Sequence, residues 1–204
     1  MDPTRHHPGA LEAHIPRCSR GPNRHITHSI LAGVLTDVLK DSGIPDRDIH
    51  VEVKAGVEDD SRPGDVAYVQ RDRPDGQLLL VDLSVTSIFR CAAYEPSSGP
   101  GSLAAAAEAG KLSKYKNVTR HRVIPFVLED GGRMGEHARA LLHELARGAA
   151  RRGRCPTDSS GCPRMAWLVS KWCEWFSAAL HSSQARQVRL GLGLDSIWGP
   201  ISPT

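Results

Sequence analysis

The sequence predicts an α/β protein in which a mixed β-sheet is flanked by helices. Hydrophobic residues make up 40% of the 204 residues, which is enough for one packed core. The hydrophobic periodicity alternates between helical and strand spacing and gives the element order α-β-β-β-α-β-α-α. A hairpin that leads into a helix and then into a further strand combines antiparallel and parallel pairing in one sheet.

The first predicted element is a helix over residues 24–42, in which apolar residues recur on one face. Asn23 supplies a capping side chain at its start, and Gly43 followed by Pro45 is typical of a helix end. The preceding residues 1–22 are rich in Pro, His and Gly and show no periodicity, so we expect them to be irregular.

Three strands are predicted next, over residues 49–57, 65–70 and 77–85. The first alternates between apolar and polar residues, as a strand with two unlike faces does. The third is an almost continuous apolar run, which indicates a central strand buried on both faces. The segment Pro74-Asp75-Gly76 is a turn signal, so the second and third strands form a β-hairpin.

The second half of the chain is predicted to contain three helices and one further strand. The helices cover residues 102–117, 134–150 and 164–182, where apolar residues recur at helical spacing. The strand covers residues 123–128, and Pro125 within it indicates a sheet edge or an irregular point.

The chain divides into an irregular N-terminal segment (1–22), a core domain (23–150) and a basic loop with a C-terminal helical extension (151–204). The formal net charge is +3, but residues 47–95 carry 6 basic and 10 acidic side chains, whereas residues 133–192 carry 10 basic and 4 acidic ones. An acidic middle beside a basic half is typical of a nucleic-acid enzyme with a metal-binding pocket. A solvated, mildly basic surface explains the same distribution.

The sequence lacks the features of a membrane or secreted protein. No apolar run approaches the length of about 18 residues that a membrane span needs, and the N-terminus has no apolar signal-peptide core. The five cysteines are odd in number and scattered, which predicts reduced thiols rather than disulfides. We therefore expect an intracellular protein.

Asp65 and Asp82 lie in the two strands of the predicted hairpin and are the first candidate site residues. If the turn centres just before Pro74, Asp65 lies directly opposite Asp82; if it centres just after Pro74, Asp65 lies opposite Ser84. Both registers put the two carboxylates on one face, with Cβ atoms about 5 Å apart when opposite and about 7–8 Å apart when diagonal. Two such carboxylates repel and are costly to bury. A divalent cation removes that cost, and carboxylate oxygens suit Mg²⁺ or Mn²⁺.

Lys111, Lys114 and Tyr115 share one face of the predicted helix 102–117. A lysine near a metal and a phosphate can stabilise developing negative charge or hold an attacking water. These three residues are explained more simply as a solvated helix face. Asp65 can likewise be explained as a surface residue. The spacing does not choose between the two lysines.

Three short segments together form a pattern that is similar to a known family. They are Arg62–Val66, Val81–Thr86 and Lys111–Tyr115. In this order they resemble the restriction-enzyme-like endonuclease domain of early-branching non-LTR retrotransposons, a branch of the PD-(D/E)xK nuclease superfamily. Arg24-His25, and Val123–Glu129 followed by Gly131-Gly132, are also similar to that family. The resemblance spans residues 14–182 and implies an αβββαβ restriction-endonuclease-like core.

The chain departs from the superfamily pattern at two positions. Gly64 separates the proline and the aspartate of the Pro-Asp motif, and the acidic-x-lysine of the third strand is Asp82-Leu83-Ser84, without a lysine. In the retrotransposon branch the lysine looks relocated to the following helix, which makes Lys111 or Lys114 its counterpart. The loop 86–102 lengthens the path from Asp82 to that helix.

The resemblance implies a metal-dependent DNA endonuclease that nicks a strand. Asp65, Asp82 and the backbone carbonyl of Leu83 would ligate Mg²⁺ or Mn²⁺, and Lys111 or Lys114 would balance charge at the attacked phosphodiester. Two residues are expected to support the site and six to hold DNA phosphates: Glu52 and Tyr115, and Lys116, Arg120, Arg122, Arg151, Arg152 and Arg154. A nuclear location and further domains of a retrotransposon polyprotein as partners follow from the same resemblance.

Other functions remain open from the sequence. His14-x-x-x-Cys18 looks like the second half of a zinc knuckle, but the first cysteine pair is absent and a closed zinc site needs four ligands, so zinc is not expected. The half knuckle and the glycine in the Pro-Asp motif favour a catalytically decayed, DNA-binding remnant of the same fold. A protein-interaction module on the tryptophan-rich last helix is a third possibility.

Overall fold

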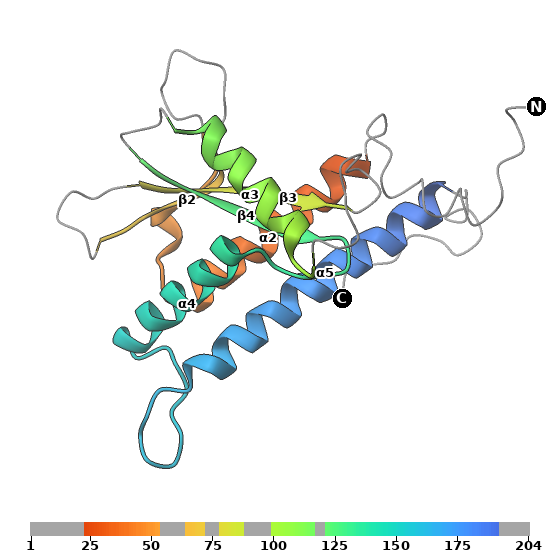
Figure 1. The fold of residues 1–204 in the computed structure, drawn as a ribbon. Coiled ribbons are helices and arrows are strands. Elements are labelled where there is room, and N and C mark those ends of the chain that lie inside the picture. Colours follow the sequence, from red (N-terminus) through yellow and green to blue (C-terminus); the bar gives the residue numbers. More distant parts are fainter. Residues whose placement is uncertain (1–22, 54–63, 72–77, 88–98, 117–120, 192–204) are drawn as a thin grey trace, which may run out of the picture.

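The computed structural model describes residues 23–53, 64–71, 78–87, 99–116 and 121–191 (Figure 1). Its elements are α2 (Asn23–Asp41), the short 3₁₀ helix η2 (Asp46–Asp48), β1 (Ile49–Val53), β2 (Gly64–Val69), β3 (Leu78–Thr86), α3 (Ser102–Lys114), β4 (Arg122–Glu129), α4 (Glu136–Arg151) and α5 (Met165–Gly191). Apart from η2, which the sequence did not predict, this is the expected order. The predicted irregular segment 1–22 and the predicted strand end 54–57 lie outside the described residues.

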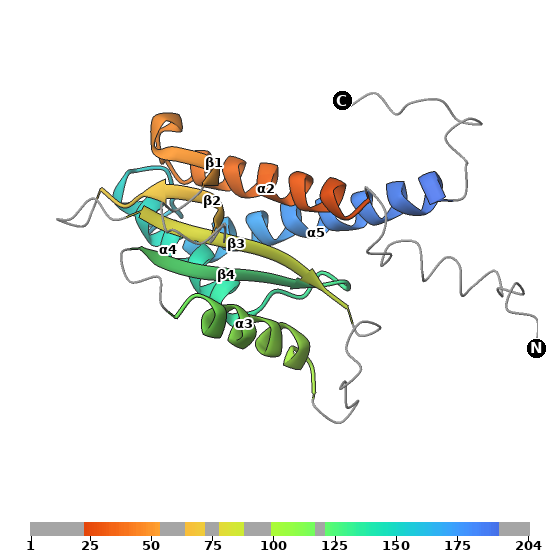
Figure 2. The ribbon, with the colours of Figure 1, turned by 90° about the horizontal axis from the view of Figure 1, so that it is seen from above.

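The four strands form one mixed sheet in the order β1-β2-β3-β4 (Figure 2). β1 pairs with β2, and β2 with β3, in antiparallel fashion, whereas β3 and β4 are parallel. The predicted hairpin and mixed sheet are therefore confirmed. So are the central position of β3 and the edge position of β4, where Pro125 lacks the N–H that an inner strand needs.

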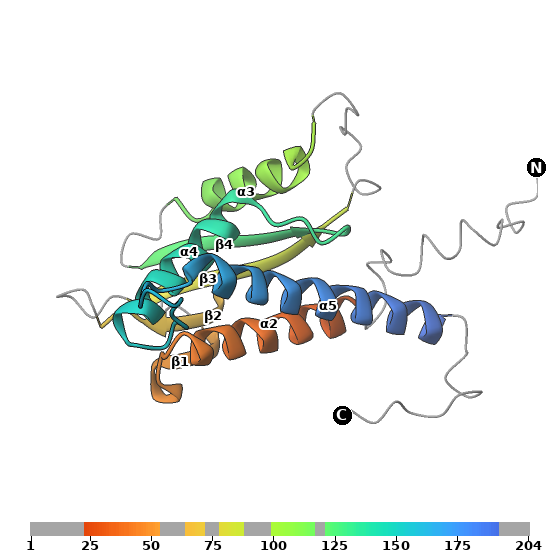
Figure 3. The same ribbon diagram turned by 90° about the horizontal axis from the view of Figure 1, so that it is seen from below.

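The helices lie in two layers. α4 and α5 cover one face of the sheet together with α2, whereas α3 runs along the edge strand β4 (Figures 2 and 3). Successive side chains of a strand point to opposite faces, so one set of strand residues enters the main core and the alternate set faces the α3 side. The α3 side contains Ala67 and Leu80, together with Asp82.

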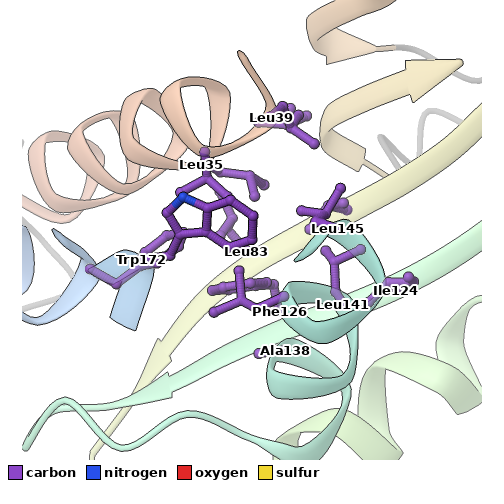
Figure 4. Close-up of a cluster of buried hydrophobic side chains, with 14 of the residues drawn as sticks. Leu35, Leu39, Leu83, Ile124, Phe126, Ala138, Leu141, Leu145 and Trp172 are labelled. Carbon is purple, nitrogen blue, oxygen red and sulfur yellow. The ribbon is translucent and has the colours of Figure 1, made fainter. Parts of the chain in front are cut away.

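The main core is built around Trp172 of α5 (Figure 4). Phe126 of β4 and Phe176 of α5 are fully buried beside it, with ring centroids 4.8 Å apart. The indole N–H of Trp172 donates to Asp41 at the end of α2 at 2.7 Å, and Lys171 contacts the same carboxylate at 3.1 Å. The core therefore joins α2 to α5 through a polar contact as well as through apolar packing.

The C-terminus of α2 ends as its sequence predicts. Gly43 has a positive φ of 88°. Its N–H donates to the carbonyl of Lys40 at 2.8 Å, and the N–H of Ile44 donates to that of Leu39 at 3.0 Å. These two bonds form the glycine-terminated helix cap that satisfies otherwise unpaired carbonyl groups.

Helix α5 is longer than the predicted 164–182 and reaches Gly191. Its additional turns pack on the start of α2, where Ser183 donates to the hydroxyl of Thr27 at 3.1 Å and Gln187 contacts the same hydroxyl. Polar side chains hold this contact, so the apolar periodicity that predicted the helix fades before the helix itself ends.

Glu108 of α3 fixes the start of α4. Its side chain is buried and accepts hydrogen bonds from the backbone N–H of His137 at 3.0 Å and from the ring Nδ1 of His137 at 2.9 Å. A carboxylate at this point satisfies unpaired N–H groups and interacts favourably with the helix dipole. Gly135 makes room for it, because a Cβ on Gly135 would lie 2.1 Å from Glu108 Oε1.

We predict that Gly135→Ala lowers the free energy of unfolding by about 1–3 kcal/mol, because the added methyl group clashes with a buried carboxylate. Gly33→Ala is the matched control. A Cβ on Gly33, inside α2, meets nothing within 4 Å. This second substitution should raise the free energy of unfolding by about 0.5–1 kcal/mol. Urea unfolding measures both, and a neutral Gly135→Ala would contradict the close approach of Glu108.

Candidate functional site

Asp65 of β2 and Asp82 of β3 come from neighbouring strands, and Asp82 lies on the α3 side of the sheet. β2 and β3 pair from Val69↔Leu78 to Val66↔Val81, which is the register of a turn that centres just before Pro74. Of the two registers that the sequence allowed, the structure therefore has the first. Asp82 is only 8% exposed, and Asp65 is partly buried.

Lys111 of α3 forms an ion pair with Asp82. Its Nζ lies 2.6 Å from Asp82 Oδ1, and both side chains are largely buried, at 20% and 11% exposure. Lys114 is exposed, and its Nζ lies against the neighbouring Tyr115, 3.2 Å from the hydroxyl oxygen and 4.9 Å from the ring centroid. Of the two candidate lysines, Lys111 is therefore the one that forms an ion pair with Asp82.

Asp65 binds a histidine and a backbone amide. His28 Nε2 of α2 lies 3.0 Å from Asp65 Oδ2, and the N–H of Leu83 donates to the same oxygen at 2.6 Å. Sequence reasoning missed His28, although it lies one helical turn after the Arg24-His25 pair that the family resemblance singled out. His28 and Asp65 come from elements that only the tertiary fold brings together.

The contacts of this pair shift two pKa values in opposite directions. The hydrogen bond to Asp65 raises the pKa of His28, against the effect of burial, and the negative charges of Asp65 and Asp82 add to the rise. Burial alone would raise the pKa of Asp65, but the hydrogen bonds from His28 and the Leu83 N–H, with the charges of His28 and Lys111, lower it overall. Asp65 is therefore held as a carboxylate and His28 as an imidazolium over a widened pH range.

Tyr115 closes the cluster from the end of α3. Its side chain is 7% exposed. Burial raises the pKa of its hydroxyl, and the hydrogen bond to Asp82 and the charges of Asp82 and Asp65 raise it further. The phenol therefore stays protonated at neutral pH and donates toward the carboxylates.

The cluster offers hard oxygen ligands. They are the carboxylates of Asp65 and Asp82 and, on geometric grounds, the carbonyl of Leu83. The N–H and C=O of a strand residue point to the same side of the strand, and the N–H of Leu83 points to Asp65. Within the described ranges, no group of three or more His, Cys, Asp and Glu side chains is gathered as a metal site. A cation here would therefore depend on two side chains, a carbonyl and water.

Glu52 of β1 lies near the cluster. It lines a hollow of about 300 Å³ together with His28, Ala32, Val51 and Asp65. Its backbone has a positive φ of 56°, which is uncommon for a residue other than glycine. The side chain is exposed, so Glu52 borders the site from the solvent side.

The predicted DNA-contact residues do not gather at the carboxylates. Arg122 is bound to Glu144 of α4 at 3.0 Å. Arg152 donates to the Ser42 carbonyl at 3.0 Å at the end of α2, which is about 21 Å along that helix from His28. Arg154 lies against Gly43, and Arg151 lines a hollow with Ile44, so both are also at this end of α2. Lys116 is exposed just after α3. Arg120, His14 and Cys18 lie outside the described residues, so their predicted roles stay predictions.

These contacts define an α/β protein whose mixed sheet carries a cluster of two carboxylates, a lysine, a histidine and a tyrosine. Neither a protein-family model, nor a curated protein, nor a solved structure matches the chain. No helix in the described part of the chain combines the length and apolarity needed to cross a membrane.

The ion pair between His28 and Asp65 predicts a pH-dependent contribution to stability. Because the pKa of His28 is raised, that contribution is complete below about pH 6.5 and is lost as the pH rises through the folded-state value. Because the pKa of Asp65 is lowered, it is present above about pH 3.8 and is lost as the pH falls through its folded-state value. The pair therefore stabilises most between these limits, by about 1 kcal/mol or less because His28 is 39% exposed.

We predict that Asp65→Asn lowers the pKa of His28, because the charge and the hydrogen bond that raise it are weakened. NMR titration of the His28 ring in the presence of EDTA measures this pKa. Asp37→Asn is the matched control, because Asp37 lines the same hollow but does not contribute to the shift. An unchanged His28 titration in Asp65→Asn would show that the pair does not form in solution.

Proposed function

We propose that the chain is a metal-dependent DNA endonuclease that hydrolyses a phosphodiester bond and nicks one strand. One observation carries the proposal. Asp65 and Asp82 are adjacent across β2 and β3, and Lys111 Nζ is 2.6 Å from Asp82. Two neighbouring carboxylates and a lysine are groups that can hold a metal ion and stabilise the charge that develops in phosphodiester hydrolysis. The order of motifs that resembles retrotransposon endonucleases supports the same function.

The donor set fits Mg²⁺ or Mn²⁺. Two carboxylates and a carbonyl are hard oxygen ligands, and such cations keep several waters when a protein offers few ligands. Asp65, Asp82 and the Leu83 carbonyl are the groups that would hold the ion. When bound, the ion would offset negative charge at the phosphate and favour a nucleophilic water.

The chain's own residues would orient the substrate and balance charge. Lys111 would donate from its ammonium group to a phosphate oxygen, moving only a short distance from Asp82. His28 would keep the carboxylate of Asp65 oriented, as the Leu83 N–H does. Tyr115, held protonated, would donate a hydrogen bond at the same edge. Hydrolysis adds a water hydroxyl to phosphorus, breaks one phosphorus–oxygen ester bond, and returns a proton to the departing oxygen.

If DNA is the substrate, two further proposals follow. A nuclear location follows from the substrate, and target choice would depend on other domains of a longer polyprotein. Both rest on the family resemblance, and neither is needed for the chemistry of the cluster.

A second function has its own supporting observation. Each carboxylate already has a cationic partner from the chain, Lys111 at 2.6 Å for Asp82 and His28 at 3.0 Å for Asp65. The charge that called for a metal is thus compensated without one. A catalytically decayed remnant that binds DNA without cleaving it would keep such a neutral cluster.

A plasmid-nicking assay tests the proposed activity. We predict nicking with Mg²⁺ or Mn²⁺, none with EDTA, and a loss of about 1,000-fold in Asp65→Asn/Asp82→Asn because both metal-binding carboxylates are removed. The near-isosteric amides preserve packing, which circular dichroism and thermal unfolding check. Nicking that survives in the folded double variant would exclude these residues as the active site.

A comparison of alanine variants at Lys111 and Lys114 tests whether Lys111 has a catalytic role. We predict that Lys111→Ala reduces nicking by about 100-fold, because it removes the ammonium group beside Asp82. Lys114→Ala is the matched control on the same helix face and should change nicking less than about threefold. Equal losses in both variants would indicate a general effect of helix charge rather than a catalytic lysine.

Calorimetric titration with Mg²⁺ separates the endonuclease from the remnant. The endonuclease predicts Mg²⁺ binding that Asp82→Asn abolishes, because that carboxylate is one of the two side-chain ligands. The remnant predicts no Mg²⁺ binding and a folded cluster that is indifferent to EDTA. Asp158→Asn, at an exposed turn outside the cluster, is the control that should leave metal binding unchanged.

A further inference from the structure

Helix α4 carries a row of basic residues along its solvent face. Arg139, His143, Arg147 and Arg151 follow one another at four-residue spacing, and all four are exposed. Residues four apart are neighbours on a helix surface, and the row extends over about 18 Å at 1.5 Å per residue. We call this row the α4 ridge.

The charge of the α4 ridge is poorly balanced. Within the described residues, no ion pair joins the guanidinium of Arg139 or Arg147 to a carboxylate. Glu136 is exposed at the start of the same helix, but Glu144 is already bound by Arg122. The ridge therefore presents a net positive surface, in contrast to the carboxylate cluster, where the cations are paired.

A groove lies beside the ridge. It has a volume of about 720 Å³ and runs between the start of α3 and α4. Arg133, Arg139 and His143 line it together with the acidic Glu136, and Ser102 lies on the α3 side. The basic surface is thus both extended along α4 and hollowed at one end, a shape that can receive a polyanion rather than a single small ion.

The α4 ridge and Asp82 are on opposite faces of the sheet. Phe126 of β4 points into the main core beneath α4, whereas the neighbouring Pro125 is the residue that pairs with Asp82. Alternate residues of a strand point to opposite faces, so Asp82 faces away from α4. A nucleic acid that lies on the ridge therefore contacts a different surface of the protein from one that binds at Asp82.

We propose that the α4 ridge binds the sugar–phosphate backbone of a nucleic acid, at a surface separate from the carboxylate cluster. Guanidinium groups pair bidentately with phosphate oxygens. A row of about 18 Å matches about five base-pair steps of 3.4 Å along one strand. Such contacts anchor a nucleic acid without reading its sequence. This inference does not depend on the endonuclease proposal.

Fluorescence anisotropy with a labelled DNA duplex, in EDTA and at salt concentrations from about 50 to 200 mM, tests the ridge. We expect Arg139→Gln/Arg147→Gln to weaken binding about tenfold and to reduce the slope of log affinity against log salt by about 1.8, since two phosphate contacts are lost. Arg164→Gln/Arg186→Gln is the matched control. It removes the same charge from two exposed arginines outside α4, so binding should change less than twofold.

Three results would overturn the ridge. They are the absence of duplex binding by the wild-type protein, an equal loss in the ridge and control variants, and ridge-dependent binding that is as tight to polyglutamate or to phosphatidylserine vesicles as to DNA. The conditions keep the test separate from the endonuclease proposal. Duplex binding is measured in EDTA, without the metal that nicking needs, so a loss of nicking does not count against the ridge, and a loss of ridge binding does not count against the cluster.

Discussion

The ion pair between Lys111 and Asp82 is the interaction on which the candidate site depends. Asp82 stands in the middle of an apolar central strand, where an uncompensated carboxylate is costly. The ammonium of Lys111 at 2.6 Å compensates it and at the same time ties α3 to the sheet. Every other member of the cluster is arranged around this pair, with Tyr115 directly after α3 and Asp65 on the neighbouring strand β2.

The helices approach the cluster from the two faces of the sheet. The face of the sheet that meets α2, α4 and α5 is filled by the core around Trp172 and Phe126. Asp65, at the start of β2, borders a hollow that is lined by α2 and β1 residues. Asp82 pairs with Lys111 on the α3 side, so the two carboxylates are reached from different helices, and neither belongs to the core around Trp172.

The two proposals put nucleic acid on both sides of the molecule. At the cluster, Lys111 and His28 are paired with carboxylates. The protein therefore offers oxygen ligands there, together with a lysine whose charge is partly balanced by Asp82. On α4, Arg139 and Arg147 are exposed and have no carboxylate partner in the described chain, and they offer charge alone. This difference in pairing separates a surface suited to chemistry from one suited to anchoring. Arg122 belongs to neither surface, because Glu144 holds it.

The sequence by itself determined the element order, the hairpin and the central position of β3, and it put Asp65 and Asp82 in two neighbouring strands. All of these follow from periodicity and turn chemistry within short segments. Only the tertiary structure decided the hairpin register, the choice of Lys111 over Lys114, and the contact of His28 with Asp65. The register depends on where the hairpin turn closes, which the turn residues left open between two positions. The two side-chain contacts depend on how α2 and α3 lie against the sheet, which is set by packing between segments far apart in the chain and is not encoded in local periodicity.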